Sequence, residues 1–184
     1  LRKIKVKAKE YAFKLILGGD GAVGKTSMVH RFVEDSFQKD YKATIGTSIM
    51  KKECNFEGLE SSVRFIIWDL AGQSQFRRIR KSYLANAEAG ILVYDVTRKK
   101  TYENVKNWYE EIKEVTPKIS LILVGNKIDL EDQREVSREE GEELAKEIGI
   151  SYIETSAKTG ENIDDAFKML ALEIIKKFFT TEEV

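Results

Sequence analysis

The sequence predicts an α/β domain built on a mostly parallel β-sheet. Short apolar runs that end in glycine or polar residues recur along the chain, as buried strands do. Amphipathic stretches with apolar residues three or four positions apart lie between them, as helices do. The two patterns alternate, which is typical of parallel sheets covered by helices. In such folds, ligands bind beyond the carboxyl ends of the strands.

The first half of the chain contains three predicted strands and one predicted helix. Residues 13–17 form an apolar run that ends in glycines, and a helix is predicted over 25–34. Residues 44–56 and 63–68 have the pattern of strands. The turn residues at 57–60 lie between them, so these two strands are predicted to form a hairpin.

The second half continues the alternation. A helix is predicted over 101–115, because its apolar spacing is helical and Pro117 stops it. Further strands are predicted at 91–94, 121–124 and 151–153.

Two helices near the end of the chain carry capping signals. Ser137 and Glu140 have the spacing of a capping box and predict a helix that runs to about residue 148. Gly149 is the expected C-terminal glycine of that helix. Asn162 is expected to cap the final helix, whose apolar residues follow helical spacing.

Composition excludes several classes of protein. The 184 residues suffice for one ordinary domain, and equal numbers of basic and acidic residues, 31 each, argue against a general nucleic-acid binder. Cys54 is the single cysteine, which excludes a disulfide framework and a multi-cysteine zinc site and fits a reducing, intracellular setting. No apolar run approaches the roughly 20 residues of a membrane-spanning helix, and we expect no secretory signal.

The first ten residues alternate basic and apolar side chains. An edge strand, a flexible arm and a membrane-surface contact are each compatible with that pattern. We favour a flexible basic arm, because five cations fall within nine residues: Arg2, Lys3, Lys5, Lys7 and Lys9.

A phosphate-binding loop is predicted between the first strand and the first helix. Residues 19–26 read Gly-Asp-Gly-Ala-Val-Gly-Lys-Thr and match the pattern G-x-x-x-x-G-K-[ST] in the expected strand–helix context. Glycines let backbone N–H groups point inward and form an anion site with the helix N-terminus. Lys25 supplies a charge to the β- and γ-phosphates, and the Thr26 hydroxyl can bind Mg²⁺. The predicted nucleotide-binding residues here are Gly21, Ala22, Val23, Gly24, Lys25, Thr26 and Ser27.

A second constellation follows the strand at 63–68. Asp69 stands at the end of that strand, where a carboxylate can reach Mg²⁺ through a water. Gly72 can place a backbone N–H against the terminal phosphate. Gln73 has both a donor and an acceptor, which suits the orientation of an attacking water. A plain strand-end carboxylate and a surface amide are the alternatives, and the phosphate loop makes them the weaker interpretations.

Two loops are predicted to recognise the base. Asn126, Lys127 and Asp129 follow the strand at 121–124. Asp129 can accept hydrogen bonds from N1–H and the 2-amino group of guanine, which adenine cannot offer, and Lys127 can lay its aliphatic stem on the base. Backbone N–H groups after the last strand can donate to guanine O6. The residues expected there are Ser156, Ala157 and Lys158.

These motifs, in this order, resemble those of the Ras superfamily of small GTPases, most closely its Rab and Ras-like branches. The resemblance covers residues 13–178. It implies a P-loop NTPase fold, the Ras-like G domain, with a six-stranded mixed sheet, one antiparallel strand and five flanking helices. It also implies an organisation into a basic arm at 1–10, a G domain at 11–180 and a tail at 181–184.

The resemblance adds site residues that pattern alone does not identify. Thr44 matches the first-switch threonine that binds Mg²⁺ and the γ-phosphate in the GTP state. Phe37 matches the aromatic residue at the guanine edge, and Tyr41 matches the tyrosine that closes over the phosphates. The implied Mg²⁺ ligands are Thr26, Thr44 and Asp69, and the implied catalytic residues are Gln73, Lys25 and Thr44.

The implied activity is a GTP-binding switch with slow Mg²⁺-dependent hydrolysis. Effectors, exchange factors and activating proteins are expected at the switch loops, around Ile49, Trp68 and Tyr83. An activating partner is expected to speed hydrolysis, as it does for Ras itself. No arginine finger is assignable. The arginines in the second-switch region are expected to face partners or solvent: Arg77, Arg78 and Arg80.

The chain also departs from the Rab pattern. Residues 45–49 read Ile-Gly-Thr-Ser-Ile where Rab proteins usually have Ile-Gly-Val-Asp-Phe, so partner identity does not transfer. Prenylated C-terminal cysteines are not present in the sequence. We therefore expect a cytoplasmic protein, or one peripheral to a membrane if a tail has been removed. We also expect a monomer that binds no nucleic acid.

Two alternatives remain beside the switch. One is a scaffold that binds GTP with negligible turnover, and retention of Gln73, Thr44 and Lys25 argues against it. The other is a P-loop kinase or ATPase, because the phosphate loop alone does not distinguish ATP from GTP.

Overall fold

Six strands form one mixed sheet in the computed structural model, which describes residues 10–37, 43–55 and 62–181. The spatial order is β2-β3-β1-β4-β5-β6. All neighbouring strands run parallel except β2 and β3, which pair antiparallel. The strands are β1 (Glu10–Gly18), β2 (Thr47–Asn55), β3 (Ser62–Leu70), β4 (Ala89–Asp95), β5 (Ser120–Asn126) and β6 (Ser151–Thr155).

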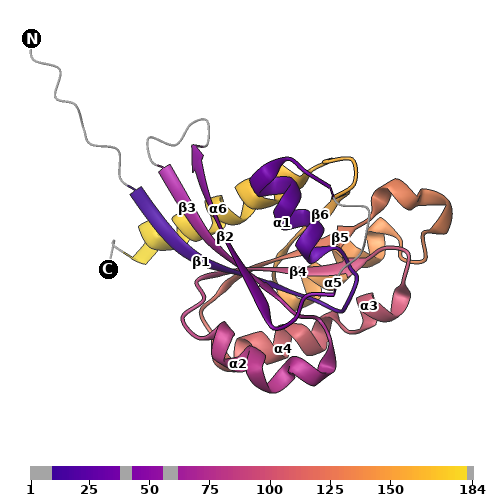
Figure 1. The fold of residues 1–184 in the computed structure, drawn as a ribbon, viewed down its shortest axis with the longest axis horizontal. Coiled ribbons are helices and arrows are strands. Elements are labelled where there is room, and N and C mark those ends of the chain that lie inside the picture. The colour runs from indigo at the N-terminus through magenta and orange to yellow at the C-terminus, as the bar shows by residue number, and fades with distance from the viewer. Residues whose placement is uncertain (1–9, 38–42, 56–61, 182–184) are drawn as a thin grey trace, which may run out of the picture.

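Helices cover both faces of this sheet. Helices α1 and α6 lie on one face, and α2, α4 and α5 lie on the other (Figure 1). The α-helices are α1 (Lys25–Glu34), α2 (Arg77–Leu84), α3 (Lys99–Glu103), α4 (Val105–Val115), α5 (Arg138–Ile148) and α6 (Ile163–Thr181). Two 3-10 helices, η1 (Ser74–Phe76) and η2 (Ile128–Gln133), lie in loops after β3 and β5. The predicted Ras-like α/β fold is confirmed.

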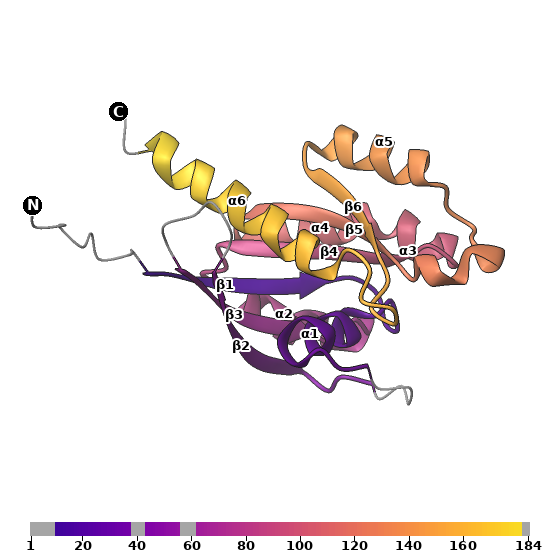
Figure 2. The ribbon, with the colours of Figure 1, turned by 90° about the horizontal axis from the view of Figure 1, so that it is seen from above.

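Each face of the sheet has its own apolar core. Alternate residues of a strand point to opposite faces, so Leu15 packs towards α1 and α6 while Ile16 packs towards α2, α4 and α5. Phe167 of α6 stacks on Phe32 of α1 with ring centroids 3.7 Å apart. The view from above looks onto the face that α1 and α6 cover (Figure 2).

The strand register brings the functional loops together. Leu17 of β1 is level with Asp69 of β3, and Asp95 of β4 is level with Asn126 of β5. Because parallel strands share an orientation, the loops after β1, β3, β4, β5 and β6 all leave from the same edge of the sheet.

Several element boundaries differ from those predicted. The predicted helix over 101–115 is divided at Asn104 into α3 and α4, and the Asn104 side chain turns to donate to Asp20. The capping box of Ser137 and Glu140 is confirmed. Asn162 precedes α6, but its side-chain amide donates to the carbonyl oxygen of Glu154.

Three predictions fall wholly or mainly outside the described residues: the basic arm at 1–10, the turn at 57–60 and the role of Tyr41. The tail at 181–184 likewise has only its first residue described. Among the described residues, no helix combines the length and the apolar character needed to cross a bilayer.

Phe167→Ala should lower the free energy of unfolding by about 3–5 kcal/mol, because it opens a cavity between α6 and α1. Phe167 is fully buried, whereas Leu172 on the same helix is 37% exposed. Leu172→Ala, the matched control, should change stability by only about 0.5 kcal/mol. Urea denaturation measures both, and equal losses would contradict the assignment of the core.

Candidate functional site

The phosphate loop curls between β1 and α1 in a conformation that requires glycine at two positions. Gly19 has φ +141°, and a Cβ there would lie 2.2 Å from the carbonyl oxygen of Val93. Gly24 has φ +103°, and its Cβ would lie 2.2 Å from the side-chain nitrogen of Asn126. Both positions therefore exclude a side chain, and the loop backbone packs directly against neighbouring strands and loops.

Lys25 is buried at the start of α1 and spans the phosphate loop. Its Nζ donates to the carbonyl oxygens of Gly19 at 2.6 Å and Asp20 at 2.7 Å. Burial lowers the pKa of Lys25 to about 8, and the nearby charges of Asp69 and Asp20 oppose that effect. The loop therefore holds one desolvated ammonium group beside its own curled backbone, an arrangement suited to an anion such as phosphate.

Three oxygen-bearing side chains converge beside Lys25. The Thr26 hydroxyl donates to Asp69 Oδ2 at 2.5 Å and lies 2.9 Å from the Thr44 hydroxyl. Asp69 is buried, and its other oxygen, Oδ1, has no hydrogen-bond partner in the described structure. Burial raises the pKa of Asp69, against the hydrogen bond from Thr26. A buried carboxylate oxygen with two adjacent hydroxyls fits a hard cation such as Mg²⁺.

Gly72 and Gln73 lie against the phosphate loop from the other side. A Cβ on Gly72 would lie 2.4 Å from the backbone carbon of Asp20, so only glycine permits this approach. The Gln73 side chain passes over Gly21, where an added Cβ would meet its Cγ at 4.0 Å. Gln73 Oε1 is buried without a hydrogen-bond partner in the described structure. Both residues thus lie directly against the phosphate loop.

Asn126 connects the loops at the other end of the site. Its Nδ2 donates to the carbonyl oxygen of Val23 at 2.9 Å. Its Oδ1 accepts from Thr155 Oγ1 at 3.1 Å and from the Ala157 N–H at 3.2 Å. One buried amide therefore joins the phosphate loop to the loops after β5 and β6.

Asp129 is held by the loop that follows β6. Its Oδ1 accepts from the Ser156 hydroxyl at 2.6 Å, and Lys158 Nζ lies 3.7 Å from Oδ2. Arg31 of α1 donates to the carbonyl oxygens of Ala157 and Lys158, which fixes that loop against the first helix.

Asp95 is an organising residue that the sequence did not indicate. Its buried carboxylate lies 2.6 Å from Lys127 Nζ and 3.0 Å from Arg98 Nε. Arg98 also donates to the carbonyl oxygen of Gly21 at 2.9 Å. Burial favours a higher pKa for Asp95, but hydrogen bonds from Lys127 and Thr97 outweigh it and lower the pKa. The position of Asp95 directly after the apolar run at 91–94 is a sequence signal that could have suggested its role. In the structure, this position lies level with Asn126 of β5.

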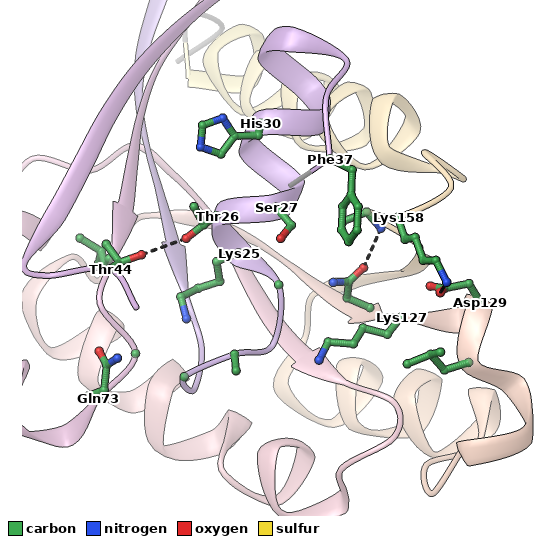
Figure 3. A pocket seen from close by; sticks show the side chains of 18 residues that line it. Lys25, Thr26, Ser27, His30, Phe37, Thr44, Gln73, Lys127, Asp129 and Lys158 are labelled. Carbon is green, nitrogen blue, oxygen red and sulfur yellow. Dashed lines mark hydrogen bonds and ion pairs between the residues drawn. The ribbon is translucent and has the colours of Figure 1, made fainter. Parts of the chain in front are cut away.

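The phosphate loop and the loops that follow β3, β5 and β6 line one cavity of about 370 Å³, a volume within the range of small-molecule sites. Lys25, Thr26, Thr44 and Gln73 lie at one end, and Phe37, Lys127, Asp129 and Lys158 lie at the other (Figure 3). The predicted residues that line it are Gly21, Ala22, Gly24, Lys25, Thr26, Ser27, Phe37, Thr44, Gly72, Gln73, Asn126, Lys127, Asp129, Ala157 and Lys158.

Four predicted site residues are not among the described residues that line the cavity: Val23, Tyr41, Asp69 and Ser156. Asp69 lies behind the lining, where it accepts the hydrogen bond from Thr26. Val23 is buried and offers its carbonyl oxygen to Asn126, and Ser156 contacts Asp129. Tyr41 lies outside the described residues. His30 of α1 also lines the cavity, and its Nδ1 lies 2.9 Å from Glu34 Oε2.

The prediction that the three arginines of α2 face partners or solvent is wrong for Arg80. Arg77 and Arg78 are exposed, but Arg80 is only 3% exposed. It forms an ion pair with Glu111 of α4 at 3.1 Å. The reason is topological, because the counterion is 31 residues further along the chain and comes into contact only when α2 packs on α4.

Comparison with known proteins agrees with this geometry. A sequence model of the Ras family matches residues 14–176. This chain belongs to the Ras family. As a Ras-family member with a Rab-like sequence, it is a small GTPase, a switch that binds and hydrolyses GTP.

Similar Ras-family relatives span most of this chain. Ras-related protein Rab-13 of Bos taurus is 42% identical over 172 residues, which cover 93% of this chain and 84% of the relative. Ras-related protein Rab-8B of Homo sapiens is 41% identical, with 93% and 82% covered. GTP-binding protein ypt2 of Schizosaccharomyces pombe is 42% identical over 177 residues, with 96% and 88% covered.

The affinity for guanine nucleotide should fall as the pH rises through about 8. Lys25 in the free protein has its pKa lowered to about 8, and bound phosphates would raise that pKa. Affinity is therefore fully present below pH 8 and declines by up to about tenfold per pH unit above it. Titration with a fluorescent GDP analogue from pH 7 to 9 measures this. Lys25→Arg is the control, because its guanidinium stays charged and any remaining pH dependence comes from titration of the nucleotide. If the affinity of the wild type changes with pH no more than that of Lys25→Arg, the assignment is wrong.

Asp95→Asn should weaken GDP binding by about tenfold, because it removes the charge that holds Lys127 and Arg98. Dissociation of the fluorescent GDP analogue provides the measurement. Asp132→Asn removes an exposed carboxylate from η2 and is the matched control, with no change expected. Equal dissociation rates in both variants would show that Asp95 does not organise the site.

Proposed function

We propose that the described cavity is the site at which this GTPase binds and hydrolyses GTP. The observation that carries the proposal is the position of Asp129 and the phosphate loop at opposite ends of one cavity. Asp129 would accept hydrogen bonds from the guanine N1–H and 2-amino groups. Lys25 and the loop N–H groups would hold the phosphates, and Asn126 keeps the two ends in register.

We further propose a magnesium site at Thr26, Thr44 and Asp69. Those residues would hold the ion, and Mg²⁺, when bound, would neutralise charge on the β- and γ-phosphate oxygens. The unpaired Asp69 Oδ1 supports this placement, because a buried carboxylate oxygen is costly unless it is matched by a cation or a donor.

Hydrolysis would proceed by in-line attack of water on the γ-phosphate. Gln73 lies over Gly21, and its Oε1 has no hydrogen-bond partner within the described part of the chain. The amide could therefore hold the water with its oxygen and donate to the phosphate with its nitrogen. Lys25 would stabilise the charge that develops on the phosphate oxygens. Catalysis here is mainly positioning, so intrinsic turnover should be slow.

The switch would follow from the contacts of Thr44 and Gly72 with the γ-phosphate, which are lost on hydrolysis. Regulators and effectors would bind the two loop states differently. The surface that we expect them to bind includes Ile49, which is half exposed, and the rings of Trp68 and Tyr83, which lie 6.0 Å apart. We infer a monomer in the cytoplasm, or peripheral to a membrane where a lipid anchor is present.

Gln73→Leu should slow single-turnover hydrolysis of bound GTP by about 10- to 100-fold, because the attacking water loses its orientation. Gln75→Leu changes an exposed glutamine two residues away and should leave the rate unchanged. Phosphate release from preloaded protein measures both. If the wild type and Gln73→Leu are equally inert, the alternative of a scaffold without turnover is correct.

Competition with ATP in the same assay tests the base assignment. ATP should fail to displace GDP at concentrations about 10⁴-fold above those at which GTP succeeds. Displacement by ATP and GTP at similar concentrations would exclude the guanine site.

A further inference from the structure

One face of α4 contacts both loops that surround the terminal phosphate position. Asn104, just before the helix, and Trp108 and Glu111 within it are spaced by four and three residues and therefore lie on the same side. Asn104 and Trp108 contact the phosphate loop through Asp20. Glu111 contacts Arg80 of α2, which follows the loop carrying Gln73.

Arg80 is the residue through which this face reaches the catalytic loop. Its Nη1 donates to the carbonyl oxygens of Ala71 at 3.2 Å and Gln73 at 2.9 Å. Its Nε and Nη2 donate to the two carboxylate oxygens of Glu111 at 3.1 and 3.3 Å. A single planar guanidinium thus fixes the backbone on both sides of Gly72 to a buried carboxylate, which a lysine with one ammonium group cannot reproduce.

The same guanidinium connects to the phosphate loop. Its central carbon lies 4.2 Å from the centroid of the Trp108 ring. The indole N–H of Trp108 donates to Asp20 Oδ1 at 2.8 Å, and Asn104 donates to the same carboxylate. The loop that carries Gln73 and the phosphate loop are therefore connected to one another through α4.

Helix α2 has few other buried anchors. Its further contacts involve exposed or half-buried side chains: the ion pairs of Arg77 with Glu111 and of Lys81 with Glu114, and the ring contact of Tyr83 with Trp68. Among its residues, only Arg80 and Leu84 are buried, and Leu84 lies at the far end from Gln73. The remaining side chains of α2 are exposed or half-buried and include Arg77, Arg78, Ile79 and Lys81. The Gln73 carbonyl oxygen accepts from Arg80 at 2.9 Å and from the N–H of Phe76 at 3.1 Å, so Arg80 is the side chain that connects it to α4.

We propose that Arg80 is a positioning residue for GTP hydrolysis, which holds the Gln73 loop against the phosphate loop through Glu111 and Trp108. The proposal rests on the hydrolytic function proposed above. Arg80 does not line the cavity. It would act through Gln73, whose carbonyl oxygen it holds and whose side chain lies over Gly21.

Arg80→Lys should slow single-turnover GTP hydrolysis by about tenfold, because a displacement of about 1 Å at a reacting group can cost up to about 100-fold. GDP dissociation should stay within about twofold of the wild type, because Arg80 does not line the nucleotide cavity. Arg77→Lys is the matched control. Arg77 contacts the same Glu111 from the exposed side, and its replacement should leave the hydrolysis rate unchanged.

A double-mutant cycle distinguishes positioning from a general structural effect. In a Gln73→Leu background, Arg80→Lys should change the residual hydrolysis rate by less than about twofold, since its target is already absent. A further tenfold loss in that background would overturn the proposal, because Arg80 would then act independently of Gln73.

A second variant guards against loss of folding. Arg80→Met combined with Glu111→Leu replaces the buried ion pair with apolar side chains of similar length, a change that is often neutral or stabilising. This variant should keep its melting temperature and its GDP affinity and still hydrolyse GTP about tenfold more slowly. Hydrolysis at the wild-type rate in this variant or in Arg80→Lys would overturn the proposal. If the wild type itself released no phosphate, the proposed function would fail first, before Arg80 was tested.

Discussion

The site depends on one buried amide, that of Asn126. Its nitrogen binds the phosphate loop at Val23, and its oxygen binds the loop after β6 at Thr155 and Ala157. Gly24 approaches so closely that any Cβ would displace the Asn126 side chain. A buried amide with all these bonds made is rigid, and leaving any of them unmade is costly. The distance between the phosphate end and the base end of the cavity is therefore set by the protein.

Folding leaves opposite charges buried at the phosphate end. Burial lowers the pKa of Lys25 and raises that of Asp69, because burial disfavours the charged form of each group. An anion beside Lys25 and a cation beside Asp69 would relieve both penalties together. Binding of a nucleotide with its metal ion would thus stabilise the folded chain, which links ligand affinity to the stability of the domain.

The strands and most loops were predictable because they follow local rules. Apolar runs located the strands, and glycine spacing located the phosphate loop before α1. Residues whose roles depend on distant partners were not predictable in this way. Asp95 and Arg80 look like surface charges in sequence, but β4–β5 pairing brings Asp95 to Lys127, and α2–α4 packing buries Arg80 against Glu111. Helix α2 itself has only two buried side chains, too few for a clear apolar period.

The two loops near the terminal phosphate position are held by different means. Thr44 is held by hydroxyl contacts to Thr26 and Asp69, both of which would be Mg²⁺ ligands, and its neighbour Ile45 is 84% exposed. The Gln73 backbone is held by Arg80, which is buried and paired with Glu111 of the protein itself. Local stability follows buried contacts, so the first loop should respond to the nucleotide state more strongly than the second. With the proposed function, this asymmetry would keep the Gln73 amide in place, while the exposed loop would report whether the γ-phosphate is present.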